Sequence, residues 1–420
     1  MNVLHVTQNY YPSIGGTQHT MKKVSECLAE YYQDEVNVFT TNSYYGPHKK
    51  TFKKIIAESE VINNVHVKRF DFIRFHKPLI RSAGKISNRL LKKPLPYFWQ
   101  ELHNGPFSPS MLNAISVSEA DVIGASSVHF RFADYTRWRM KTVRPKPFVL
   151  YGAIHISPQR PLNQRYLQRI QQCEQYIANT SFEKEYLVDN GIEPGKIEVI
   201  GTATDILSFA SLIAPENDLK IKYGIKPDEI VLTCISRHEV SKGIVLLTEA
   251  YSHLKKIYPH IRLLIAGGSG EHTNSLLKLA SEDISILVLS DISNEEKAEI
   301  LSLTDLLILP SKEESFGVVF LEAWSFCKPV IGAGIGAIAS LVEEGRDGLL
   351  FSPDDVKSLV EKASILIDNK EIRELLGKAG YHKVKTRYQW DIITGKFRFA
   401  YEKAIEKFAQ IKTDKGSIKN

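Results

Sequence analysis

The fold is decided by the stretch Pro310-Ser311-Lys312-Glu313-Glu314-Ser315-Phe316-Gly317-Val318-Val319-Phe320-Leu321-Glu322-Ala323, which directly follows the apolar run Asp305–Leu309. A short apolar run that passes through a polar turn into a helical segment predicts a strand-to-helix unit of an α/β protein. A helix that begins there presents unpaired backbone N–H groups and the positive end of its dipole, which suits a bound phosphate. Gly317 lets a ligand approach the backbone closely.

Two carboxylates of this stretch, Glu314 and Glu322, are eight residues apart. One lies in the predicted loop and one in the predicted helix, so they should face different parts of one elongated ligand. Carboxylates accept hydrogen bonds from hydroxyl groups, which sugars and riboses supply in pairs. The alternative is that both are surface residues that compensate the helix dipole.

Apolar runs alternate with helix-length amphipathic segments along the whole chain, which predicts an α/β fold with parallel sheets. One series of expected strands comprises Val3–Thr7, Val36–Thr41, Val65–Phe70, Asp121–Ala125, Phe148–Tyr151, Ile177–Asn179 and Glu198–Ile200. A second series comprises Ile230–Ile235, Arg262–Ala266, Ile284–Leu289, Asp305–Leu309 and Pro329–Gly332. We therefore expect two doubly wound domains.

The segment 201–228 separates the two series and contains Pro215 and Pro227, so we expect a linker there with its hinge near Thr204. The predicted N-terminal domain comprises residues 1–204 and a C-terminal helix at about 388–410. The second predicted domain comprises residues 205–387. The lysine-rich tail 411–420 is expected to be disordered.

Composition narrows the class of protein. The 420 residues carry a net charge of +6. Residues 1–200 hold 26 Lys+Arg against 17 Asp+Glu, whereas the remainder holds 28 against 31, so the basic surplus is N-terminal. No run approaches the ~18 apolar residues that a membrane-spanning helix needs, and the first residues read as a strand and not as a signal peptide. Four scattered cysteines suggest neither disulfides nor a zinc site, so we expect a cytoplasmic protein. We expect no nucleic-acid partner.

Residues 77–93 predict a basic amphipathic helix. Arg81, Lys85, Arg89 and Lys93 recur every four residues, and apolar side chains fill another face. One interpretation is a helix packed on the core with a solvated basic face. The other is attachment to an anionic membrane surface, which would place the protein peripherally at the inner face of a membrane.

The pattern Pro-Ser-x-x-Glu-Ser-Phe-Gly-x-x-x-Leu-Glu-Ala resembles the Glu-x7-Glu motif of the retaining glycosyltransferases of family 4. These have the GT-B fold, in which two Rossmann-like domains face each other across an interdomain cleft. The resemblance implies that the N-terminal domain (1–204 with the helix at about 388–410) binds the acceptor and that the C-terminal domain (205–387) binds the nucleotide sugar. The resemblance implies that Glu314 holds the hydroxyls of the transferred sugar and that Glu322 holds the ribose diol. It further implies a donor site that includes Ser315, Phe316, Gly317 and Val318.

Other segments extend the resemblance. Arg237 and Lys242 match the family's Arg-x4-Lys-Gly segment, and together they can neutralise a diphosphate and stabilise it as it leaves. Taken alone, such a pair would usually be a solvated face. Two glycine-rich turns and a late aromatic segment also look like the family's. The implied donor-binding glycines are Gly267, Gly268 and Gly270 in one turn and Gly15 and Gly16 in the other, and the late segment is Gln389-Trp390-Asp391.

The chain also departs from the family pattern. The usual Asn-Gly-hydrophobic-Asp segment at the end of the N-terminal domain reads Gly201-Thr202-Ala203-Thr204-Asp205, where only Asp205 matches. A His often ends the strand that corresponds to Phe148–Tyr151, but here His155 is the nearest candidate for a catalytic role and His129 competes with it. Either His can instead be a structural hydrogen-bonding residue.

The resemblance implies a hexosyltransferase of the EC 2.4 class that retains the anomeric configuration. The donor is a nucleoside-diphosphate sugar, the acceptor is a glycan, a lipid-linked molecule or a small molecule, and neither cofactor nor metal is expected. Rival interpretations are a nucleotide-sugar epimerase, a phosphorylase, for which no pyridoxal-binding Lys signature is present, and a non-catalytic nucleotide-sugar-binding subunit.

Overall fold

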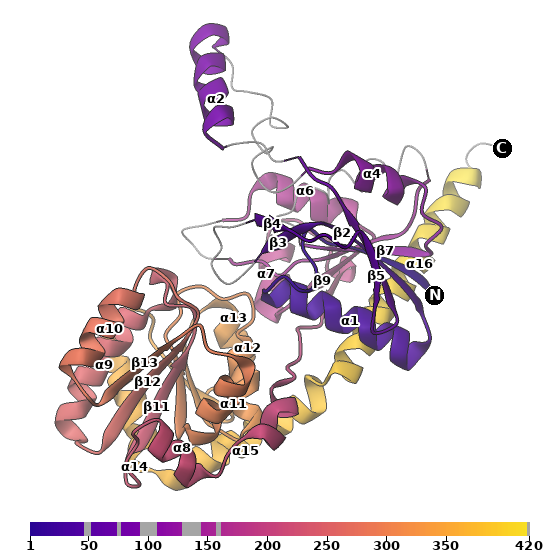
Figure 1. Cartoon of the computed structure of the whole chain (residues 1–420). Helices are drawn as coiled ribbons and strands as arrows, with labels where there is room; N and C mark the ends of the chain where they lie inside the picture. Colours follow the sequence, from indigo (N-terminus) through magenta and orange to yellow (C-terminus); the bar gives the residue numbers. More distant parts are fainter. Residues whose placement is uncertain (46–51, 74–76, 93–106, 128–143, 157–160, 418–420) are drawn as a thin grey trace.

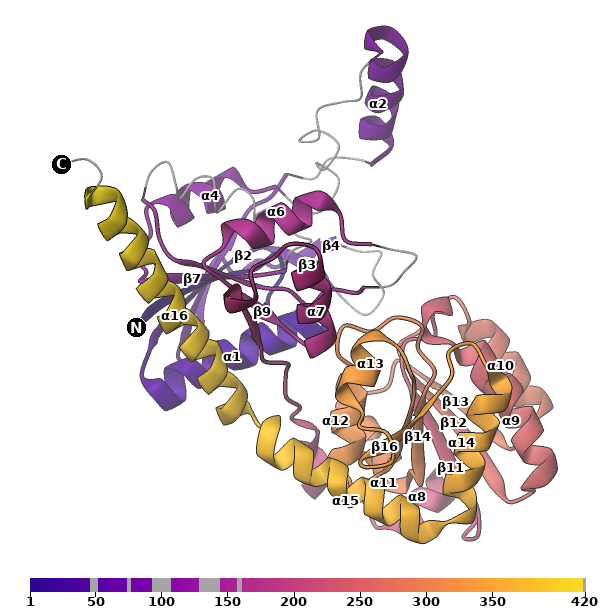
Figure 2. The same cartoon turned by 180° about the vertical axis from the view of Figure 1, so that it is seen from behind.

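The structure is a computed structural model that describes residues 1–45, 52–73, 77–92, 107–127, 144–156 and 161–417. Its two halves each contain a largely parallel sheet with helices on both sides (Figure 1). The expected α/β class with two Rossmann-like units is confirmed. A single helix returns from the second half to the first (Figure 2).

The N-terminal sheet has eight strands in the order β10-β9-β8-β7-β1-β2-β6-β5. All neighbours pair in parallel except β5, which lies antiparallel to β6 at the edge. The strands are β1 (Asn2–Val6), β2 (Glu35–Thr41), β5 (Ser59–Ile62), β6 (Val65–Phe70), β7 (Val122–Ser126), β8 (Phe148–Tyr151), β9 (Gln175–Ala178) and β10 (Ile197–Val199). A separate antiparallel pair consists of β3 (Ser43–Tyr45) and β4 (Phe52–Lys54).

The helices described in this half are α1 (Gly16–Tyr32), α2 (Lys77–Leu91), α4 (Pro109–Ser116), α6 (Gln164–Gln172) and α7 (Ser181–Asp189). Polar side chains begin several of them: Ser108, Asn163 and Thr180 each accept a backbone N–H of the first turn. Such caps satisfy donors that have no partner within the helix. The connection to the second half contains the 3₁₀ helices η2 (Pro194–Lys196) and η3 (Ile206–Leu212).

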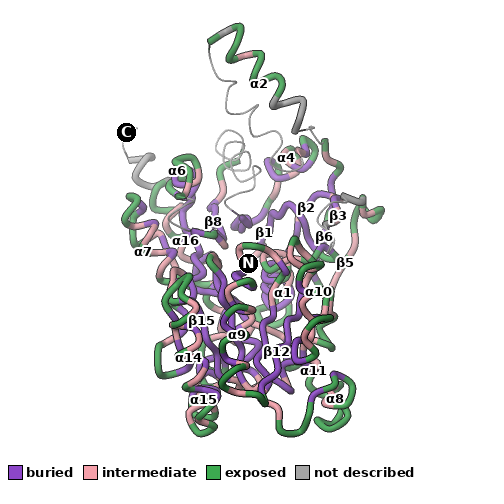
Figure 3. The backbone as a smooth tube through the Cα atoms, turned by 90° about the vertical axis from the view of Figure 1, so that its left-hand side faces the viewer, coloured by how far each residue is buried: buried purple, intermediate pink, exposed green. Residues whose placement is uncertain are grey.

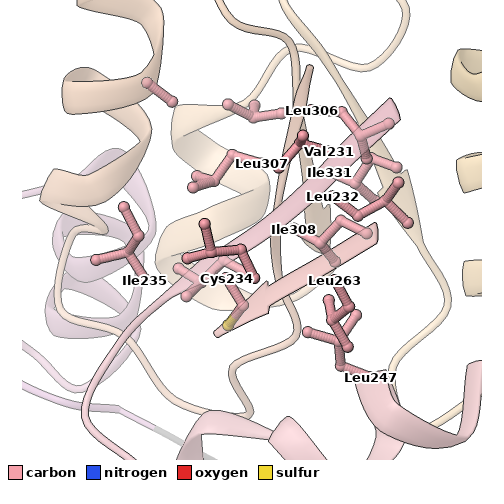
Figure 4. Packing of buried hydrophobic residues seen from close by; sticks show 14 of the residues in the cluster. Val231, Leu232, Cys234, Ile235, Leu247, Leu263, Leu306, Leu307, Ile308 and Ile331 are labelled. Carbon is pink, nitrogen blue, oxygen red and sulfur yellow. The ribbon is translucent and has the colours of Figure 1, made fainter. Parts of the chain in front are cut away.

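The C-terminal sheet is entirely parallel, with the order β13-β12-β11-β14-β15-β16. Its strands are β11 (Ile230–Ile235), β12 (Ile261–Gly267), β13 (Ile286–Ser290), β14 (Leu306–Leu309), β15 (Val330–Ala333) and β16 (Gly348–Phe351). Helices cover both of its faces, so the central strands consist mostly of apolar residues, which pack into one core (Figure 4).

The helices of this half begin with α8 (Glu216–Lys222), before β11, and end with the long α15, after β16. They are α8, the 3₁₀ helix η4 (Val240–Lys242), α9 (Ile244–Ile257), α10 (Thr273–Glu282), α11 (Asn294–Leu303), α12 (Val318–Ser325), α13 (Gly336–Leu341), α14 (Val356–Asp368) and α15 (Lys370–Arg387).

The last helix, α16 (Trp390–Ser417), packs against α1 and the N-terminal sheet. The ring of Phe397 lies 5.4 Å from that of Tyr151, and Tyr401 hydrogen-bonds the buried His5 at 2.8 Å. The helix runs to Ser417, whereas we expected it to end near Gln410 with disorder from residue 411. The physical reason is that the lysine-rich end contains no residue that stops a helix before Gly416.

The basic amphipathic helix forms as α2, which begins at Lys77 and ends at Leu91, while residue 93 lies outside the described residues. It stands apart from both sheets in Figures 1 and 2, and its described side chains are mostly exposed (Figure 3). Ile86 is 57% and Leu90 74% exposed. The interpretation of a helix whose apolar face packs on the core is therefore wrong for this part of α2.

Candidate active site

The C-terminal sheet has a topological switch point between β11 and β14, where the strand order reverses. Ligands of open α/β sheets bind outside the carboxyl ends of the strands at such a point. The loop after β11 carries Arg237 and Lys242, and the loop after β14 carries Glu314. The topology therefore places these three predicted site residues on adjoining loops.

The two loops are joined directly. The backbone N–H of Lys312 donates to the Ser241 carbonyl at 2.9 Å. Gly243 has a φ of 67°, and a Cβ there would overlap the Pro310 carbonyl oxygen. The Lys242 ammonium donates to Oε1 of Glu314, with both side chains about nine-tenths buried. The predicted phosphate-binding cation and the predicted sugar-binding carboxylate thus form one ion pair.

Arg237 lies beside the glycine-rich turn that follows β12. Its Cγ would be 3.2 Å from a Cβ at Gly268, and its guanidinium pairs with Glu239. A Cβ at Gly267 would overlap the Ser236 backbone, and one at Gly270 would overlap the His238 backbone. These three glycines therefore let the turn pack directly onto the loop that carries Arg237.

The helix α12 (Val318–Ser325) begins directly after Gly317, which adopts φ 94° and caps it. Phe316, just before the cap, is buried against Tyr388, with their ring centroids 5.6 Å apart. Ser315 and Val318 flank this turn and are partly exposed. On the second turn of α12, Oε1 of Glu322 accepts a hydrogen bond from Nζ of Lys297 at 2.6 Å.

Several loops at the carboxyl ends of the two sheets meet. Phe316 also contacts the segment after β10, since a Cβ at Gly201 would lie 2.9 Å from its ring. In addition, α7 and α13 are neighbours: the ring of Phe182 lies 3.2 Å from the place of a Cβ at Gly336. The loops after β14 and β15 therefore lie on the side of their sheet that faces the N-terminal half.

The remaining predicted site residues belong to the N-terminal half. Gly15 caps α1, which begins at Gly16, and no hydrogen bond or ion pair between described residues links either glycine to Arg237 or Lys242. His155 is exposed and lies four residues beyond β8. The competing His129 lies outside the described residues.

A buried acid, Glu183, lies next to the carboxyl ends of β8 and β9 in the N-terminal sheet. Oε1 of Glu183 accepts from the Tyr176 hydroxyl at 2.5 Å, and Oε2 accepts the backbone N–H of Asn179 at 2.9 Å. Burial raises the pKa of Glu183 to about 7, although both hydrogen bonds oppose the shift. A Cβ at Gly152 would overlap the Tyr176 hydroxyl, so this strand end is closely packed.

Sequence reasoning did not identify three polar residues on or beside these loops. Lys297 and Glu239 pair with Glu322 and Arg237, and no motif marks either of them. The hydroxyl of Ser311 is fully buried and has no hydrogen-bond partner among the described residues. Buried hydroxyls normally have a partner, so this one is unusual. In the sequence, the only signal for Ser311 was its position within the segment 310–323.

Models of two families match the chain: "Glycosyltransferase Family 4" over residues 14–206 and "Glycosyl transferases group 1" over residues 215–383. The chain belongs to glycosyltransferase family 4. A sulfoquinovosyl transferase of Arabidopsis thaliana is 24% identical over 322 residues, covering 73% of this chain and 61% of that protein. The chain spans between half and two thirds of the first curated relatives that it matches.

Solved structures show that this family 4 chain has the GT-B fold. A sucrose-phosphate synthase from Thermosynechococcus elongatus superposes with a TM-score of 0.70 at 17% identity, covering 98% of this chain and 100% of that one. The Anabaena protein HepE in complex with UDP gives 0.71 at 17% identity, with 95% and 98% covered. None of the described helices is long and apolar enough to cross a membrane.

Proposed function

We propose that this chain transfers a sugar, with retention of its anomeric configuration, from a nucleoside-diphosphate sugar to an acceptor hydroxyl. The observation that carries the proposal is the ion pair between Lys242 and Glu314 at the switch point of the C-terminal sheet, with Arg237 on the same loop as Lys242. Family membership supports the reaction class, and the structurally similar HepE was solved in complex with UDP. The donor-binding residues proposed include Glu322 and the two glycine-rich turns.

In this reaction the bond between the anomeric carbon and the diphosphate oxygen breaks. The acceptor oxygen bonds to the same carbon from the face that the diphosphate leaves, and its proton passes to the departing phosphate. Arg237 and Lys242 stabilise the negative charge that grows on the diphosphate, which is the largest contribution a preorganised site makes. We propose that these cations do so without a metal ion.

A thermal-shift screen over nucleoside-diphosphate sugars tests donor binding, because a ligand that binds only the folded state raises Tm. One donor should stabilise the wild type and should stabilise Lys242→Met much less. Proton NMR of the product formed with a glycan or lipid-linked acceptor should then show the donor's anomeric configuration. Inversion of that configuration would refute retention, and conversion of the donor alone into an epimer would favour the epimerase.

A second proposal concerns the surface at which the enzyme binds its acceptor. We propose that α2 binds an anionic membrane surface at the cytoplasmic face, which suits a lipid-linked acceptor. The sequence from 72 to 100 contains seven Lys+Arg and no Asp or Glu. Within α2, Lys85 and Arg89 accompany the exposed Ile86 and Leu90. Basic and apolar groups on one exposed helix favour the interface of anionic lipid.

Flotation with liposomes tests this surface. The wild type should float with vesicles of phosphatidylglycerol and phosphatidylcholine and remain behind with phosphatidylcholine alone. Lys85→Glu combined with Arg89→Glu should abolish flotation. The matched control, Lys357→Glu with Lys378→Glu on other exposed helices, should float like the wild type. Equal flotation of both double variants would refute the proposal.

A further inference from the structure

The ion pair between α11 and α12 is placed to orient the carboxylate of Glu322. Lys297 and Glu322 are 25 positions apart, yet Nζ lies 2.6 Å from Oε1. Their side chains are 21% and 11% exposed, so the pair is largely removed from water. A charge-assisted hydrogen bond in such surroundings fixes geometry more firmly than an exposed pair does.

The pairing with Lys297 leaves the second carboxylate oxygen of Glu322, Oε2, available to a ligand. Among the described residues, Oε2 of Glu322 accepts no hydrogen bond, and it is not a fully buried orphan atom. Because Oε1 is engaged from the α11 side, the rotamer of Glu322 is fixed. A carboxylate oxygen held in this way can accept from a vicinal diol without the entropic cost of ordering its side chain.

The start of α11 is itself rigid. Ser293 and Glu296 form a capping box, with hydrogen bonds of 3.1 and 2.8 Å. Lys297 is the next residue along the helix. Its ammonium therefore starts from a well-defined backbone position and reaches across to α12.

We infer that Lys297 is a positioning residue that sets the enzyme's selectivity for ribose in the donor. This inference rests on the proposed function, in which Glu322 binds the ribose diol. Removing the ammonium would free Glu322 to rotate and would leave a partly buried carboxylate without its cation. The consequence should be a weaker contact with the diol and not a general loss of diphosphate binding.

The test compares ribose with its deoxy counterpart. Calorimetry should be carried out with UDP, GDP and ADP and with the 2′,3′-dideoxy form of each. The wild type should bind one ribonucleotide about tenfold or more tightly than its dideoxy form, as expected for a hydrogen bond to a charged acceptor. In Lys297→Met that ratio should fall below about threefold, while affinity for the dideoxy form stays within about threefold of wild type.

A matched control is Lys278→Met on α10, whose partner Glu282 lies 3.8 Å away at the surface; its ratio should equal that of the wild type. Lys297→Arg, which keeps a cation, should recover most of the selectivity. A wild-type ratio retained in a folded Lys297→Met overturns the inference alone. Equal binding of both forms by the wild type overturns the role of Glu322 with it, and binding of no nucleotide overturns the proposed function too.

Discussion

Three carboxylates around the donor loops are each paired with a cation of the chain. Glu239 pairs with Arg237, Glu314 with Lys242, and Glu322 with Lys297. Partly buried charges are costly without a partner, so these pairs keep the loops stable in the absence of ligand. A bound diphosphate would compete with Glu314 for Lys242 and release that carboxylate to the sugar.

This competition gives a prediction for Glu314→Gln. The variant should bind a nucleoside diphosphate as well as the wild type or better, because Lys242 no longer shares its charge with a carboxylate. Its kcat with the complete nucleotide sugar should fall about 10- to 100-fold, since a charge-assisted contact with the sugar is lost. Calorimetry and initial rates measure the two effects, and a parallel loss of nucleotide affinity would contradict this assignment.

Glu183 gives a prediction for pH. Its pKa is raised from 4.5 to about 7 in the fold, so the folded state holds this proton more tightly than the unfolded chain does. The resulting stabilisation is complete below pH 4.5 and is lost as the pH rises through 7. Relative to Glu183→Gln, the wild type should therefore lose about 3 kcal/mol of unfolding free energy between those values.

Urea unfolding of both proteins from pH 4.5 to 7.5 measures this difference. Burial lowers the pKa of His5 to about 3, so His5 acts in the opposite sense, but its contribution is common to both proteins and cancels. Parallel stability curves for wild type and Glu183→Gln would show that Glu183 does not titrate in this range.

At the scale of single elements, the donor site depends on how closely loops approach each other. Gly243 is the clearest case, because both its positive φ and the Pro310 carbonyl exclude a side chain. Gly243→Ala should lower the unfolding free energy by about 2 kcal/mol or more. Gly195→Ala, where a Cβ would meet its nearest atom at 3.5 Å, should change stability little. Similar Tm values for the two variants would contradict this account.

The elements differ in how well their sequence patterns predict them. Buried parallel strands such as β11 and β14 are largely apolar runs, so they were predicted to within one or two residues. The edge strand β5 was missed because exposed and partly buried residues alternate along it. The four-residue β16 was also missed, since it follows a turn and begins with Gly348.

The residues of the candidate site also differ in whether the sequence could predict them. Glu314, Glu322 and Lys242 were predicted because the strand-to-helix turns after β14 and β11 resemble those of the family, whereas their spacing alone left solvated surface residues as the alternative. Lys297 could not be selected, because its pairing with Glu322 depends on how α11 and α12 pack. The roles of Gly15, Gly16 and His155 remain predictions, since they depend on a ligand shared between the two halves of the chain.

At the scale of the molecule, α16 makes the N-terminal half depend on the end of the chain. Phe397 is fully buried against that half, so Phe397→Ala should cost about 3–5 kcal/mol. Hydrogen exchange should accelerate for the amides of β7 and β8 and stay unchanged for β11 and β12. Phe399→Ala on the same helix, where the ring is 56% exposed, is the control. Equally accelerated hydrogen exchange in both sheets would contradict the claim that α16 stabilises the N-terminal half alone.

The account as a whole depends on a diphosphate bound where β11 and β14 diverge. Calorimetric titration with UDP, GDP, ADP, CDP and TDP tests this most directly, using the wild type, Arg237→Met with Lys242→Met, and the control Lys278→Met with Lys357→Met. We predict that one nucleotide binds the wild type and the control alike and binds the first double variant about 100-fold or more weakly. Equal affinity for all three proteins, or no binding by the wild type, would contradict the account.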